Sequence, residues 1–235
     1  MEELLTKGLI GKLGFVFGDT VFFFAMVFCI VVPYLLGSIN FAVVFSKSMH
    51  HDDVREHGSG NAGSTNMLRT YGVKAAALTL SCDILKGVIS TLLGFLILPY
   101  YTGFAYISAL MCMLGHAFPI YYGFKGGKCV ATFAGALLVL NPLLWILLLL
   151  SFVLIVYLSR YVSLASVICA AAFPILNNMM PFYMLKWEGG ILPVPWPGII
   201  AAFLMGVLII VLHRQNLVRL WQGKESKISF KKKKS

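Results

Sequence analysis

Residues 57–69 combine side chains that could bind an anion within an otherwise apolar chain. The segment holds three glycines, two serines, a threonine, two asparagines and Arg69. Glycines let backbone N–H groups approach an anion and hydroxyls add donors. An arginine can hold a phosphate through two parallel hydrogen bonds. We interpret the segment as a phosphate-binding loop, with an ordinary flexible loop as the alternative.

A second donor-rich segment, residues 115–132, contains the run Phe124-Lys-Gly-Gly-Lys128 between two apolar stretches. A helix that begins near Lys128 would direct its free N–H groups and the positive end of its dipole at this break. The run can therefore cradle a phosphate. It is not a P-loop, because Cys129 stands where that motif needs Ser or Thr. A turn that carries topology-setting lysines is the alternative.

Two shorter polar segments follow. In Arg160–Ser166, Ser163 is either a ligand-binding residue or the N-cap of the next helix. In His213–Arg219, His213 and Asn216 are three residues apart and would share one helix face. A basic helix that anchors to lipid headgroups is the alternative for this last segment.

Charged residues inside apolar stretches are expected to be paired. Asp83 and Lys86 are three residues apart in such a stretch, and we predict a structural ion pair there. We interpret His116 as a hydrogen-bonded packing residue, and we expect Glu225 to pair with a basic neighbour. The chain has no CxxC pair and no clustered carboxylates suited to Mg²⁺, so we expect neither a metal nor another cofactor.

The composition defines a membrane protein. Of the 235 residues, 59% are hydrophobic and 12% are charged, whereas soluble domains are about 45–50% apolar and about 25% charged. A membrane-spanning helix needs about 20 apolar residues. We predict an all-α polytopic bundle of about seven transmembrane helices: Val21–Phe45, Val73–Leu98, Phe104–Tyr122, two segments of Val130–Leu158 that turn at Asn141-Pro142, Val162–Tyr183 and Ile191–Leu212.

The positions of Lys and Arg predict the orientation. With seven spans and a cytoplasmic C-terminus, fifteen of the nineteen Lys and Arg lie in inner segments, and the N-terminus is outside. The net charge of +10 then reflects topology and contact with membrane lipids, not nucleic-acid binding. A five-span arrangement keeps the same inner loops. We divide the chain into an interfacial segment (1–18), a membrane-embedded domain (19–228) and a basic tail (229–235).

Three runs closely resemble the bacterial acyl-phosphate:glycerol-3-phosphate acyltransferases, the PlsY family. They are GSGNAGSTNMLR (58–69), GHAFPIYYGFKGGKCVAT (115–132) and HRQNLVRLWQGKESKI (213–228). The resemblance implies a seven-helix enzyme of the bacterial inner membrane with its active site at the cytoplasmic face. It also implies the reaction: an acyl group passes from acyl phosphate to glycerol 3-phosphate. Three positions depart from the family pattern, namely Ala62 for Pro, Cys129 for Gly, and Gln215 for an acidic residue.

The resemblance also implies roles for individual residues. The phosphoryl group of the acyl phosphate would be held by Ser59, Thr65, Asn66, Gly126, Gly127, Lys128 and Asn216. Glycerol 3-phosphate would be held by Arg69, Lys128, Ser163 and His213. We expect the catalytic set to be Ser59, Arg69, Lys128, His213 and Asn216, with structural support from Asp83, Lys86 and Glu225. No acyl-enzyme is needed, and either a substrate phosphate, which we favour, or His213 accepts the hydroxyl proton.

Two other classes of function remain open from the residues alone. A transporter for a phosphorylated solute predicts an inverted repeat and a site near the middle of the membrane, and the sequence shows no internal repeat. A lipid-binding membrane protein without enzymatic activity would account for the basic tail but not for the glycine-rich loops.

Overall fold

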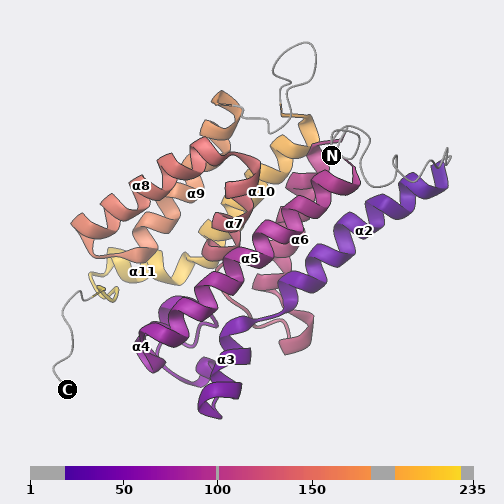
Figure 1. Ribbon diagram of the computed structural model, residues 1–235. Coiled ribbons are helices and arrows are strands. Elements are labelled where there is room, and N and C mark those ends of the chain that lie inside the picture. The colour runs from indigo at the N-terminus through magenta and orange to yellow at the C-terminus, as the bar shows by residue number, and fades with distance from the viewer. Residues whose placement is uncertain (1–18, 99–100, 181–193, 229–235) are drawn as a thin grey trace.

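The computed structural model describes residues 19–98, 101–180 and 194–228, and these residues form helices and loops without a strand (Figure 1). The predicted all-α membrane bundle is confirmed. The predicted interfacial segment 1–18 and basic tail 229–235 lie outside the described residues. The elements are α2 (Asp19–Ser38), α3 (Phe41–His50), η1 (Val54–Glu56), α4 (Ser64–Tyr71), α5 (Val73–Ile97), α6 (Gly103–Ala117), η2 (Ile120–Tyr122), α7 (Val130–Leu140), α8 (Pro142–Ser159), α9 (Val162–Met179), α10 (Trp196–Leu212) and α11 (Arg214–Trp221).

Within the described ranges, five helical stretches are long and apolar enough to cross a membrane. They are Phe22–His50, Val73–Ile97, Gly103–Tyr122, Pro142–Ser159 and Val162–Met179. A sixth is added if α10 and α11, which meet at a bend of 53°, count as one span. Helix α7 has 11 residues, so it is roughly 16 Å long, about half the thickness of the hydrocarbon core. The count of seven spans remains a prediction.

Local sequence marks three breaks between helices, at Asn40, Pro119 and Asn141. Helix α7 ends before Asn141, whose Oδ1 caps α8 by accepting from the Leu144 N–H at 3.0 Å, so the predicted turn is confirmed. The predicted third span matches the apolar stretch Gly103–Tyr122, within which α6 ends at Ala117, ahead of Pro119, and η2 follows. The predicted first span overlaps the apolar stretch Phe22–His50, in which α2 ends at Ser38 and α3 begins at Phe41.

Small residues let the helices pack closely. A side chain at Gly87 would overlap the Thr132 carbonyl of α7, and one at Gly115 would overlap the Tyr34 carbonyl of α2. Close backbone approach of this kind is the usual basis of helix association in lipid. Larger side chains fill the space between α7 and α9, where the Phe133 and Phe173 ring centroids lie 4.9 Å apart.

Helices α3, α4 and α11 gather at one end of the bundle, toward the lower left of Figure 1. Two hydrogen bonds join segments that are far apart in sequence at this end. The Arg55 guanidinium donates to the Tyr122 carbonyl at 3.1 Å, and Lys128 Nζ donates to Asn216 Oδ1 at 2.7 Å. The three long donor-rich segments predicted from sequence are therefore brought to the same end of the molecule.

Candidate active site

The loop before α4 is shaped by Asn66. Its Nδ2 donates to the carbonyls of Val54 and His57, both at 2.9 Å, and its Oδ1 accepts from the Ser59 N–H at 3.0 Å. Gly58 has φ +57°, and a side chain there would overlap Asn66 Oδ1. Both Nδ2 hydrogens of Asn66 are used within the loop, so in this arrangement its side chain organises the loop and offers no donor to substrate.

Side chains near this loop remain available to a ligand. Ser59 and Arg69 are exposed, and Thr65 is half-buried. Thr65 and Arg69 are four residues apart on α4 and therefore share a face. Among the described residues, no hydrogen bond joins the hydroxyls of Ser59 or Thr65 to the other candidate residues. Helix α4 begins after Gly63 without a side-chain cap, which leaves the donors of its first turn uncapped by a side chain.

The second loop, residues 123–129, depends on two consecutive glycines. The Gly127 N–H donates to the His116 carbonyl at 3.0 Å. A side chain at Gly126 would overlap that carbonyl, and one at Gly127 would overlap His116 Nε2 and lie 2.7 Å from the Ala62 carbonyl. Only glycine permits this packing between α6 and the loop 57–63. Helix α7 follows at Val130, also without a side-chain cap.

A hydrogen-bonded chain joins this loop to the C-terminal segment. Asn216 accepts from Lys128 Nζ at 2.7 Å and donates from Nδ2 to Glu225 Oε1 at 2.6 Å. Ser163 Oγ donates to the same Glu225 oxygen at 2.8 Å, and Arg219 Nε donates to Oε2 at 2.8 Å. The predicted pairing of Glu225 with a basic neighbour is confirmed. Ser163 is not the N-cap of α9, since Tyr161 occupies that position.

The ionisable groups in and around this hydrogen-bonded chain shift one another's pKa values. Burial, then the charges of Arg219 and Arg69, lower the pKa of Lys128, and Glu225 opposes them. Burial raises the pKa of Glu225, but hydrogen bonds from Asn216, Arg219 and Ser163 outweigh it and hold that pKa below its ordinary value. The carboxylate stays ionised at neutral pH and balances part of the positive charge.

His213 follows α10 and is buried, with 4% of its surface exposed. Its Nδ1 lies 2.8 Å from the Ile209 carbonyl oxygen. A carbonyl only accepts, so Nδ1 carries the hydrogen, and in the neutral ring Nε2 is an acceptor. Asn216, three residues later, is also buried at 7%. His213 lies at the bend between α10 and α11 and Asn216 lies within α11, so the two do not share one helix as their spacing predicts.

The predicted ion pair between Asp83 and Lys86 is confirmed, with Nζ 2.9 Å from Oδ1 and both side chains buried. His116 is buried beside them, with Nδ1 2.9 Å from Lys86 Nζ, as expected for a hydrogen-bonded packing residue.

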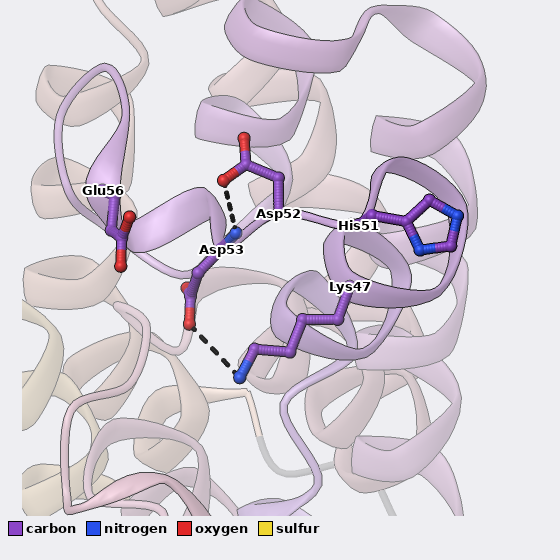
Figure 2. A pocket seen from close by; sticks show the side chains of 5 residues that line it. All are labelled: Lys47, His51, Asp52, Asp53 and Glu56. Carbon is purple, nitrogen blue, oxygen red and sulfur yellow. Dashed lines mark hydrogen bonds and ion pairs between the residues drawn. The ribbon is translucent and has the colours of Figure 1, made fainter.

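Two cavities lie near the first loop. One, of about 490 Å³, is lined by Lys47, His51, Asp52, Asp53 and Glu56 (Figure 2). Its three carboxylates disfavour a phosphate, and Asp53 already pairs with Lys47 at 3.6 Å. The other, of about 530 Å³, reaches both loops through Gly60 and Gly126, with Arg55 and Lys125 among its lining residues. It is also lined by Asp53 and Glu56, so neither cavity is free of carboxylates. In the described ranges, no cluster of three His, Cys, Asp or Glu could hold a metal.

Two arginines in the site were not assigned from sequence. Arg219 holds Glu225 by a hydrogen bond. Arg219 is three residues after Asn216, and this spacing on one helix face could have indicated its place in the site. Arg55 joins the two loops through the Tyr122 carbonyl, and nothing local indicates that contact. Of the assigned residues, the structure links Lys128, Asn216, Ser163 and Glu225 directly, and Arg69 through its charge.

The helices and this cluster define an integral membrane protein with a cationic, donor-rich site at one end of its bundle. A family model described as glycerol-3-phosphate acyltransferase matches residues 27–223. The glycerol-3-phosphate acyltransferase of Cupriavidus necator is 43% identical over 207 residues, covering 86% of this chain and 96% of that protein. The enzyme of the same name from Syntrophomonas wolfei is 38% identical over 205 residues, covering 86% and 96%.

Solved structures agree with these relatives. The crystal structure of PlsY (YgiH), an integral membrane glycerol 3-phosphate acyltransferase, in its glycerol 3-phosphate form has a TM-score of 0.78 at 33% identity and covers 87% of this chain and 96% of that one. The lysophosphatidic acid form has a TM-score of 0.75 at 32% identity and covers 87% and 95%. The chain belongs to the glycerol-3-phosphate acyltransferase family, and the resemblance to PlsY is confirmed.

Proposed function

We propose that this membrane acyltransferase takes its acyl group from an acyl phosphate and transfers it to the 1-hydroxyl of glycerol 3-phosphate. The products are 1-acylglycerol 3-phosphate and inorganic phosphate. The observation that carries the proposal is the link from the two-glycine turn through Lys128 to Asn216 and Glu225. It places a half-buried ammonium, which can bind a phosphate, directly after a glycine turn that packs against His116 and Ala62.

An acyl phosphate suits a site built in this way. It is a mixed anhydride with a good leaving group, so the enzyme needs no covalent acyl intermediate. The 1-hydroxyl oxygen bonds to the acyl carbon, and the bond from that carbon to the phosphate oxygen breaks. Inorganic phosphate leaves with the electron pair. Catalysis then consists of positioning two phosphorylated substrates and stabilising the negative charge that develops.

We assign the substrates as the sequence resemblance implies. Ser59, Thr65, the turn at Gly126–Lys128 and Asn216 hold the phosphoryl group of the acyl phosphate. Arg69, Lys128, Ser163 and His213 hold glycerol 3-phosphate. Ser163 reaches Glu225 in the present arrangement, so it would exchange this partner for substrate. Asn66 acts through the backbone of the loop that it organises.

The hydroxyl proton passes to a substrate phosphate oxygen in this proposal. His213 binds the phosphate of glycerol 3-phosphate as an imidazolium, since a nearby phosphate dianion favours the charged ring. The ring would donate from Nε2 while Nδ1 keeps its hydrogen bond to Ile209. His213 as the general base is the competing role. His213→Gln separates the two, because a retained donor preserves a binding role and leaves the KM for glycerol 3-phosphate closer to that of the parent than in His213→Ala.

The active site faces the cytoplasm of a bacterial inner membrane in this proposal, because the inner segments carry most of the Lys and Arg. The acyl chain then lies between helices, toward lipid.

The test is an assay of the purified protein with palmitoyl phosphate and glycerol 3-phosphate that follows both lysophosphatidate and phosphate. We expect equal amounts of the two products. The matched donor controls are palmitoyl-CoA and palmitoyl acyl carrier protein, which should give no product. Turnover with either of these and none with palmitoyl phosphate would reject the proposed donor.

A further inference from the structure

A buried ammonium holds the break between α2 and α3. Lys86 Nζ donates to the carbonyls of Gly37 at 2.9 Å and Ile39 at 2.8 Å, and lies 2.9 Å from Asp83 Oδ1. These carbonyls belong to the end of α2 and the break that follows it, where the helical hydrogen bonds stop. The side chain of Lys86 is only 4% exposed. The ammonium therefore satisfies carbonyl groups that would otherwise be exposed to lipid or left without a donor.

The same ammonium contacts His116 on α6. Nζ lies 2.9 Å from His116 Nδ1. An ammonium has no lone pair, so Nδ1 accepts and the ring hydrogen is on Nε2. Nε2 is the atom that a side chain at Gly127 would overlap, so this edge of the ring lies against the glycine turn. The His116 carbonyl also accepts from the Gly127 N–H at 3.0 Å.

Gly127 in turn lies against the first loop. A side chain there would come within 2.7 Å of the Ala62 carbonyl. Continuous contacts therefore run from the end of α2 through Lys86 and His116 to Gly127, and on to the loop 57–63. An ion pair in the membrane interior costs free energy that an apolar pair of similar size would not. Its place between the α2–α3 break and His116, which contacts Gly127, gives a reason for its presence.

We propose that Lys86 and His116 are positioning residues for the phosphate site. This rests on the proposed function and deepens it. Neither residue touches substrate. Lys86 fixes the chain that leads from α2 into α3 and toward the loop 57–63. His116 holds Gly127 in place through its ring and its carbonyl group. Loss of either contact leaves Lys128 and the loop N–H groups free to move away from the geometry that both substrates require.

Helix α6 supplies a matched control. Tyr106 and Asn177 form a second buried polar pair, with Asn177 Nδ2 donating to the Tyr106 hydroxyl at 3.1 Å. Tyr106 is ten residues from His116 on α6, so the two lie roughly 15 Å apart along the helix. In the described part of the chain, the hydrogen bonds of this pair reach neither substrate loop. Tyr106→Phe therefore removes a buried hydrogen bond from the same helix without disturbing the site.

The experiment compares His116→Ala, His116→Asn and Tyr106→Phe, purified in detergent, by two measurements. The first is kcat/KM with palmitoyl phosphate and glycerol 3-phosphate. The second is amide hydrogen exchange of residues 123–129. We expect His116→Ala to lower kcat/KM by at least about tenfold and to speed exchange. His116→Asn should recover part of both, since its Oδ1 can accept from Lys86. Tyr106→Phe should stay within about twofold of the parent in both.

Three results would overturn the proposal. One is a His116→Ala variant with the activity and exchange of the parent. Another is an equal loss in Tyr106→Phe, which would make the effect one of general stability. The third is a His116→Asn variant with the same kcat/KM and hydrogen exchange as His116→Ala, which would show that the contact with Lys86 does not position the turn.

A second variant covers the case in which His116→Ala does not fold. The double variant Asp83→Asn, Lys86→Met removes both charges together, so no unpaired charge is buried. We expect it to fold, to lose at least about tenfold in kcat/KM and to exchange faster over residues 123–129; parent-like values would contradict the proposal. If the parent itself does not use palmitoyl phosphate, the proposed donor is rejected, and hydrogen exchange alone decides the positioning role.

Discussion

Lys128→Ala tests the centre of the proposed site. The ammonium has three hydrogens, and one is donated to Asn216 Oδ1 at 2.7 Å. Two remain for substrate phosphates. A hydrogen bond to a charged group is worth about 1.5–3 kcal/mol, so their loss amounts to roughly 3–6 kcal/mol. That corresponds to a fall in kcat/KM of about 10²–10⁴-fold.

The assay measures kcat and KM for palmitoyl phosphate and for glycerol 3-phosphate in folded, monodisperse protein. Lys128→Arg should recover little, because a wide planar guanidinium does not fit where a compact ammonium lies between Asn216 and a phosphate. Lys74→Ala is the matched control, since Lys74 is an exposed lysine at the start of α5, beside α4, that makes no contact in the site.

The refuting result is a folded Lys128→Ala protein with kcat/KM within about threefold of the parent. It would show that neither the Lys128 ammonium nor the glycine turn takes part in substrate binding or catalysis. A loss confined to thermal stability would assign Lys128 to a structural link between α7 and α11 instead.

Three further predictions follow from the same site. Gly127→Ala should abolish turnover, because its methyl group would overlap His116 Nε2. Gly123→Ala meets nothing within 4 Å and bears only the backbone strain of its φ of +64°, about 1–2 kcal/mol, so it should keep most activity; kcat/KM of both variants decides. Turnover should survive EDTA without added Mg²⁺, and a loss restored by Mg²⁺ would contradict the site electrostatics. The pKa of Glu225 is lowered, so its stabilisation is present above the unfolded value near 4.5 and is lost as pH falls through the lowered pKa. Thermal unfolding from pH 7 to 3 should show this loss in the parent and less of it in Glu225→Gln.

The sequence predicts the parts of the fold that have local causes. Hydropathy located the apolar helices, and the pair Asn141-Pro142 marked a turn because Asn caps and Pro begins a helix. Pro119 carried a similar signal for the end of α6, which hydropathy alone overlooked. The break after Ser38 also has a local cause, because Asn40 caps α3 by accepting from the Val43 N–H at 3.2 Å. The same break is also held by Lys86, whose Nζ bonds the Ile39 carbonyl from 47 residues away, and only the folded chain shows that contact.

Residue type predicts the chemistry of the site better than the role of each side chain. Asn66 and Asn216 were both assigned to the acyl phosphate. In the structure Asn66 directs both amide hydrogens to backbone carbonyls of its own loop. Asn216 instead accepts from Lys128 and donates to Glu225. The difference arises because Asn66 is buried beneath a loop and Asn216 lies between two charged groups, and spacing in sequence encodes neither surrounding.

The glycine turn also explains why the site needs two buried polar networks. A backbone that approaches a phosphate closely must lack side chains, so Gly126 and Gly127 have no side-chain contacts of their own to fix them. Their position must come from neighbours. On one side the ring and carbonyl of His116 hold Gly127. On the other, Asn216 holds the next residue, Lys128, and is itself fixed by Glu225. The turn and Lys128 are therefore held from both sides.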